Sequence, residues 1–71
     1  MDIKMKGVIK WYKKDKQCGY IIGADDVIYY FSNLDCIDIN ETFEEGDNVL
    51  FIPMFGEMDS ASKVEKVSLD E

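Results

Sequence analysis

Residues 7–31 read GVIKWYKKDKQCGYIIGADDVIYYF, and this stretch decides the fold. Its segments 7–12, 18–22 and 27–31 are rich in β-branched and aromatic residues, which are typical of β-strands. The runs KKDK and GADD between these segments are typical of turns, and the second is short enough for a hairpin. The stretch therefore predicts three consecutive strands joined by two turns.

Two further strands follow at a larger spacing along the chain. Residues 32–34 predict a single helical turn with Ser32 as its N-cap. Residues 35–47 form an acidic loop before a predicted strand at 48–55, and a final alternating segment predicts a fifth strand at 63–67. No segment has the sustained periodicity of an amphipathic helix.

Five short strands in so short a chain predict an all-β fold. The architecture that this pattern favours is a small five-stranded antiparallel barrel of the oligonucleotide-binding (OB) type, rather than a sandwich. A chain of 71 residues has room for one domain. We therefore expect a single domain over residues 1–71, with the barrel at about 5–67.

The composition argues against an enzyme and against a metal site. The chain has no histidine, and its two cysteines, Cys18 and Cys36, do not form a zinc-binding pair. With no nucleophile beside a base and no glycine-rich phosphate loop, we expect no catalysis, no metal, no cofactor and no small-molecule substrate. The absence of a secretory leader favours a cytoplasmic protein with reduced thiols, although a Cys18–Cys36 disulfide stays open. We also expect a monomer. No apolar run has membrane-spanning length.

Charge is distributed unevenly along the chain. The formal net charge is −7, yet residues 1–20 carry six lysines against two acidic residues, a net of +4. Residues 21–71 carry two lysines against thirteen acidic residues, a net of −11. The basic part holds two of the three aromatic segments, and aromatic rings interleaved with cations can form a stacking surface for single-stranded bases. We therefore expect a local nucleic-acid-binding face on an otherwise acidic protein.

Residues 5–67 resemble a bacterial cold-shock domain. The matching residues are Gly7-Val8-Ile9-Lys10-Trp11-Tyr12, Asp15-Lys16 with Gly19-Tyr20-Ile21, Asp26-Val27 with Phe31-Ser32, Glu44-Glu45-Gly46, Val49 with Phe51, and Val64 with Val67. The resemblance implies a five-stranded OB barrel that binds single-stranded RNA and DNA, with a preference for pyrimidine-rich strands. Its two ribonucleoprotein motifs would lie on the second and third strands.

Both ribonucleoprotein motifs depart from the family pattern. In the first, Gln17 stands where the family has a glycine, and Cys18 stands where it has a stacking phenylalanine. In the second, Ile28 replaces another stacking phenylalanine, and Tyr30 replaces a histidine. Because one base–aromatic stack contributes ~1–3 kcal/mol, losing two rings would weaken binding strongly unless something compensates.

The resemblance assigns nucleic-acid contact to eight residues: Lys10, Trp11, Tyr12, Lys16, Tyr20, Ile28, Tyr30 and Phe31. The two lysines would contact phosphates and the others would contact bases. Ile37 or Ile39 would stand in for a loop aromatic of the family.

Strand alternation agrees with only part of this assignment. Successive side chains point to opposite faces of a sheet, so Phe31 cannot share a face with Tyr30 unless the strand bends or bulges. The same restriction applies to Lys10 and Trp11. Three other aromatic residues are expected in the core: Tyr29, Phe43 and Phe51.

The function that these features favour is single-stranded nucleic-acid binding by an RNA chaperone or a cold-shock-type regulator. The alternative is a protein-interaction OB module that has lost most nucleic-acid binding. The missing rings and the acidic remainder favour that alternative, which would show an exposed apolar patch around Cys18 and Ile28.

Overall fold

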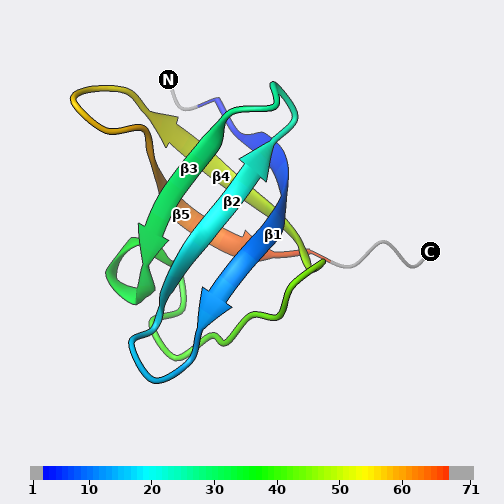
Figure 1. The fold of residues 1–71 in the computed structure, drawn as a ribbon, viewed down its shortest axis with the longest axis vertical. Coiled ribbons are helices and arrows are strands. Elements are labelled where there is room, and N and C mark those ends of the chain that lie inside the picture. Colours follow the sequence, from blue (N-terminus) through cyan, green and yellow to red (C-terminus); the bar gives the residue numbers. More distant parts are fainter. Residues whose placement is uncertain (1–2, 68–71) are drawn as a thin grey trace.

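The computed structural model describes residues 3–67, which form five strands and one short helix. In chain order the elements are β1 (Met5–Lys13), β2 (Cys18–Gly23), β3 (Ile28–Ser32), the 3-10 helix η1 (Asn33–Asp35), β4 (Asn48–Met54) and β5 (Ser60–Lys66). The strands close into a barrel in the order β1-β2-β3-β5-β4 (Figure 1). The expected all-β barrel is confirmed, and it is consistent with an OB-fold.

One strand pairing departs from the expected antiparallel barrel. β3 and β5 are parallel and pair through Tyr30 and Ser60, whereas the other four strand pairs are antiparallel. Strand directions cannot alternate all the way around a closed ring that has an odd number of strands. A five-stranded barrel must therefore contain a parallel pair, and here that pair closes the barrel.

Two strands are longer than the sequence indicated. β1 begins at Met5 because its first residues pair with β4, where Met5 lies opposite Phe51. β5 begins at Ser60, three residues before the predicted start at 63. The register between β4 and β5 shifts next to Lys63, which has a left-handed φ of 50°. This bulge interrupts the alternation that would have marked the first half of β5.

The helical turn after β3 begins at the expected cap. The backbone N–H of Ser32 donates a 2.9 Å hydrogen bond to the carboxylate of Asp35, and the Ser32 hydroxyl donates to the same oxygen at 3.3 Å. This arrangement satisfies the start of η1, which then ends after one turn. Across residues 3–67, no helix is long enough and apolar enough to span a membrane.

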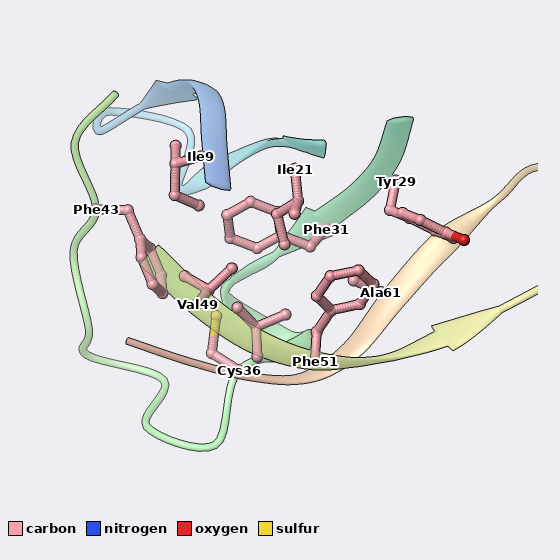
Figure 2. Packing of buried hydrophobic residues seen from close by; sticks show 10 residues of the cluster. Ile9, Ile21, Tyr29, Phe31, Cys36, Phe43, Val49, Phe51 and Ala61 are labelled. Atoms are coloured by element: carbon pink, nitrogen blue, oxygen red, sulfur yellow. The ribbon is translucent and has the colours of Figure 1, made fainter. Parts of the chain in front are cut away.

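The core fills the barrel with inward-facing side chains from the five strands and the loop before β4 (Figure 2). The largest of these side chains are fully buried: Ile9, Ile21, Tyr29, Phe31, Phe43, Val49, Phe51 and Val64. The predicted core placement of Tyr29, Phe43 and Phe51 is therefore confirmed. Because every second residue of β2 and β3 points inward, the residues between them form an outer face.

A hydrogen bond connects the core to the β2–β3 hairpin. The Tyr29 hydroxyl donates to the Asp25 carboxylate at 2.6 Å, and the Val27 backbone N–H donates to the same carboxylate at 3.1 Å. Burial and this hydrogen bond raise the pKa of Tyr29 to about 12. The bond from Tyr29 in turn lowers the pKa of Asp25. The hairpin is thus held by a neutral tyrosine and an ionised carboxylate.

Candidate functional site

Three aromatic rings form a continuous row on the outer face of β1, β2 and β3. Trp11 lies directly opposite Tyr20, and Tyr20 lies directly opposite Tyr30. The ring centroids are 5.6 Å apart in the first pair and 5.8 Å apart in the second. Trp11 is 45% exposed and Tyr20 is 40% exposed, while Tyr30 is partly buried. We call these three residues the ring platform.

A bulge in β1 places Trp11 in this row. Ile9 pairs with Ile21 and Trp11 pairs with Tyr20, so Lys10 is an extra residue on β1. Both Lys10 and Trp11 are consequently exposed, whereas Ile9 stays in the core. The irregularity that the resemblance required for Lys10 and Trp11 is therefore present.

Gly19 permits the close approach of β1 at this bulge. Gly19 lies opposite Tyr12, next to the point where the register shifts. A Cβ atom at Gly19 would overlap the Trp11 carbonyl oxygen and would come within 3.0 Å of the Tyr12 Cα. Any other residue here would push β1 and β2 apart, so this glycine is needed to hold Trp11 beside Tyr20.

Two of the eight expected contact residues point inward instead. Phe31 is fully buried, because β3 pairs with β2 without a register shift and the alternation continues through it. The Tyr12 ring packs against Phe31 and Phe43, with centroid distances of 6.0 and 5.4 Å. The expectation that Phe31 faces a ligand is therefore wrong, and the Tyr12 ring faces the core as well.

The hydroxyl of Tyr12 is also buried. Within the described residues it has no hydrogen-bond partner. Loss of water around it raises the pKa of Tyr12, and the nearby Cys36 adds to this rise. Its surroundings thus resemble those of a core residue more than those of a surface ring.

An aliphatic row lies beside the ring platform. Val8 pairs with Ile22 and Ile22 pairs with Ile28, and we call these three residues the aliphatic row. Val8 is 42% exposed and Ile28 is 48% exposed. A shallow groove of about 250 Å³ continues from Val8 and Ile22 past Lys6 and Asn48. Ile28 therefore lies on the outer face, as expected, but beside aliphatic neighbours.

A third row lies on the other side of the ring platform. It consists of Lys13, Cys18 and Ser32, which pair across the same three strands. Cys18 is a free, partly exposed thiol, so the two positions without stacking rings flank the platform on opposite sides. Partial desolvation raises the pKa of Tyr30, and the neighbouring Cys18 contributes to the rise.

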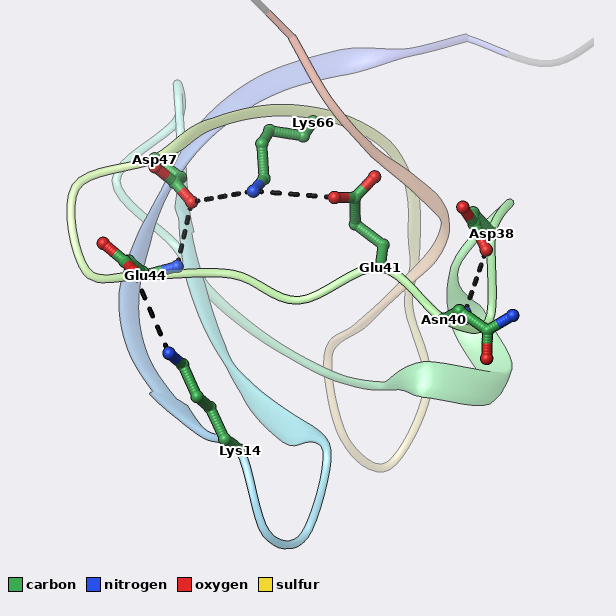
Figure 3. A network of polar contacts seen from close by, with 7 residues as sticks. All are labelled: Lys14, Asp38, Asn40, Glu41, Glu44, Asp47 and Lys66. Carbon is green, nitrogen blue, oxygen red and sulfur yellow. Dashed lines mark hydrogen bonds and ion pairs between the residues drawn. The ribbon is translucent and has the colours of Figure 1, made fainter.

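The lysines near the ring platform are available for anions. Lys10, Lys13 and Lys16 are exposed, and none of them forms an ion pair within residues 3–67. Other lysines pair with acidic residues of the loop before β4, and one of these pairs, Lys14 with Glu44 at 3.9 Å, lies at the turn after β1. Lys66 lies 3.5 Å from both Glu41 and Asp47, and these contacts are drawn in Figure 3. Lys10, Lys13 and Lys16 therefore supply positive charge beside the rings that is not paired within residues 3–67, close to the acidic loop that pairs with Lys14.

The turn that presents Lys16 is formed by a residue with an unusual backbone. Gln17 has a left-handed φ of 53°, and its N–H donates to the Lys13 carbonyl at 2.7 Å. Glycine adopts this conformation more readily than glutamine does. The left-handed backbone at this position therefore explains why the resemblance leads one to expect a glycine there.

Two outer-face residues were missed by the sequence interpretation: Val8 and Lys13. Two pairs of consecutive apolar residues, Val8-Ile9 and Ile21-Ile22, carried the signal. One member of each pair must point outward in a strand, so an aliphatic row could have been inferred. Ile37 and Ile39 are both exposed, in the loop that follows η1.

A scan of the sequence against protein-family models found no match, and neither did a search of curated proteins. The resemblance to a cold-shock domain therefore stays a prediction, while the barrel itself is consistent with an OB-fold. Within residues 3–67, no three histidine, cysteine, aspartate or glutamate side chains are grouped so that they could hold a metal ion.

Proposed function

We propose that this protein binds single-stranded nucleic acid by stacking bases on the ring platform. The observation that carries the proposal is the contiguous outer row of Trp11, Tyr20 and Tyr30. Rings on the outer face of strands 2 and 3 are the usual recognition surface of OB barrels. Each stacked base would contribute ~1–3 kcal/mol, whatever its identity, because every base has a π-face.

The unpaired lysines support the same function. Lys10, Lys13 and Lys16 lie around the ring platform, and they would contact phosphates and position the strand without reading its sequence. Three such contacts predict that log K falls with log salt with a slope of about −2 for a single strand. The acidic remainder of the protein would repel the rest of a long polyanion, so binding would be confined to one face.

The mechanism that follows is passive. A base stacked on a tyrosine or tryptophan ring is held apart from its pairing partner, and a strand held this way cannot re-form a hairpin. Such a protein would act as an RNA chaperone or as a cold-shock-type regulator in the cytoplasm, as a monomer without cofactors. We expect both RNA and DNA to bind, with a preference for pyrimidine-rich strands.

A fluorescence titration tests this proposal. Trp11 is the only tryptophan, so its emission reports directly on the ring platform. Oligo-dT and oligo-U should quench it, more strongly at low salt than at high salt. Trp11→Phe is the matched control, because it removes the signal and keeps a ring; binding to it would be followed by anisotropy of a labelled oligonucleotide. Unchanged Trp11 emission and no complex at low salt would contradict the proposal.

The aliphatic row favours a second candidate function, a protein-interaction module. Val8 and Ile28 are exposed and Val8 lines the groove, and exposed apolar surface commonly marks a protein contact. Binding through this row would be insensitive to salt and would be weakened by Ile28→Ser. Nucleic-acid binding through the ring platform would weaken with salt, and it would be weakened less by Ile28→Ser than by Tyr20→Ala.

A further inference from the structure

The ring platform ends at both sides of the three-stranded face. On one side, the residue beside Tyr30 is Ser60 of β5, which has no ring. On the other side, the pairing of β1 with β4 stops at Val8, before the strand reaches Trp11. Among the described residues, the row therefore contains three rings and no fourth.

The neighbouring rows offer no ring either. The aliphatic row lies on one side and the row of Lys13, Cys18 and Ser32 on the other, and neither presents a π-face. All but one of the remaining aromatic side chains pack in or against the core: Tyr12, Tyr29, Phe31, Phe43 and Phe51. Phe55 is exposed, and the centroid of its ring lies 6.0 Å from that of Tyr29. Phe55 belongs to a loop that also carries Glu57 and Asp59.

The charged residues around this face also limit the length of nucleic acid that can lie on it. Lys10 and Lys13 lie at the ring platform and beside it, and Lys16 lies in the turn that follows β1. Beyond the aliphatic row, the chain turns through Asp25 and Asp26, both exposed. Lys6 is also exposed on that side and offsets only one of these two charges, so phosphates are attracted more strongly at the end with three lysines.

We infer that the site takes a tract of three consecutive unpaired bases, laid across β1, β2 and β3 with one base on each ring. The backbone of the tract passes along the lysine side of the platform. This inference rests on the proposed function and deepens it, because it defines the ligand as a short single-stranded tract. A longer nucleic acid can occupy the same three-base site in more than one register, but it gains no further stacked base.

A length series of oligothymidylates tests the inference by Trp11 quenching at fixed low salt. From two to three thymidines, affinity should rise by about 5- to 150-fold, the effect of one stacked base. From three to nine thymidines it should rise only about seven-fold, because nine residues offer about seven registers of a three-base site.

Two results separate failure of the inference from failure of the proposed function. A rise of five-fold or more for each added thymidine between three and seven would overturn the three-base site while leaving nucleic-acid binding intact. The absence of quenching and of a complex for every length at low salt would overturn both.

Variants sharpen the test. Ile28→Phe adds a ring beside the platform and should create a new step of about 5-fold or more between three and four thymidines. Ile28→Leu is the matched control: it adds no ring, so it should create no new increase in affinity between three and four thymidines. Tyr30→Ala should remove the step between two and three thymidines. If Tyr30→Ala does not fold, the Ile28 pair still decides: equal steps in both Ile28 variants would overturn the inference.

Discussion

The inner and outer faces of β1, β2 and β3 both carry aromatic rings, drawn from neighbouring positions in the sequence. Trp11 faces out and Tyr12 faces in, and Tyr30 faces out between two buried residues, Tyr29 and Phe31. The inner rings pack among one another and fill the barrel, whereas the outer rings contact one another and remain partly accessible. Residue type alone therefore does not distinguish a core ring from a binding ring; strand alternation and the position of bulges do.

The largest expected effect is at an inner ring. Phe31→Ala should lower the free energy of unfolding by about 3–5 kcal/mol, because it opens a cavity next to Tyr12 and Phe43. Urea unfolding measures this loss, and the matched control Phe31→Leu should lose much less. Oligonucleotide affinity of the folded fraction should not change. A stable Phe31→Ala protein with weakened binding would place this ring at the ligand after all.

An outer ring should show the opposite behaviour. Tyr20→Ala should weaken oligo-dT binding by about 5- to 150-fold, because it removes the central stack. The free energy of unfolding should change by about 1 kcal/mol or less. Isothermal titration and urea unfolding on the same preparation give both numbers. Tyr20→Phe is the control and should keep most of the affinity. Tyr20 would belong to the core if the alanine variant unfolds while its folded fraction binds normally.

Rebuilding the missing rings should strengthen the outer face without affecting the inner one. The double variant Cys18→Phe and Ile28→Phe adds rings on both sides of the platform, and affinity should rise ten-fold or more. The core should not be overpacked, because both positions lie on the outer face. Equilibrium titration against one oligonucleotide at one salt concentration compares the proteins. Equal affinities in a folded double variant would mean that these positions do not reach the ligand.

Alkaline pH should lower the stability of the fold through ionisable groups on the inner face. The pKa of Tyr29 is raised to about 12 and that of Cys36 to about 11, in both cases mainly by burial. Between about pH 9 and 12 the folded protein retains protons that the unfolded chain has lost. Stability is therefore fully present below pH 9 and declines as pH rises through this window.

Thermal melts across this pH range measure the decline, and Tyr29→Phe is the control. That variant lacks the titrating hydroxyl, so its melting temperature should fall less between pH 10 and 12. Equal declines in the two proteins would show that Tyr29 does not couple ionisation to folding.

The smallest effect is expected at Tyr12. Its hydroxyl is buried and has no hydrogen-bond partner among the described residues, so Tyr12→Phe should leave stability unchanged or raise it by about 1 kcal/mol. Oligonucleotide affinity should not change, because the ring faces Phe31 and Phe43. Differential scanning calorimetry and one titration check both statements. A clear loss of affinity would show that the hydroxyl contacts the ligand.

Much of the fold could be predicted from local patterns. The first three strands, the turn between β2 and β3, and Ser32 as a cap all followed from residue types within a few positions. The start of β5 could not be predicted, because the bulge beside Lys63 breaks its alternation. The parallel pairing of β3 with β5 was also missed, because it follows from closure of the barrel rather than from either strand.

The candidate site could be predicted only where alternation and the resemblance agreed. Tyr20, Ile28 and Tyr30 lie on the outer face as expected, and a bulge at Lys10 adds Trp11. Phe31 was misplaced because the resemblance required a bend in β3, whereas its pairing with β2 is regular.

The most direct test of the central claim is a nuclear magnetic resonance titration with oligo-dT that follows every aromatic side chain at once. If bases stack on the outer face, the signals of Trp11, Tyr20 and Tyr30 should shift progressively with added oligonucleotide, whereas those of the buried Phe31, Phe43 and Phe51 should hardly move. The inner rings serve as controls within the same sample. Shifts confined to the inner rings, or an unperturbed Trp11 indole in the presence of a complex, would contradict stacking on the ring platform.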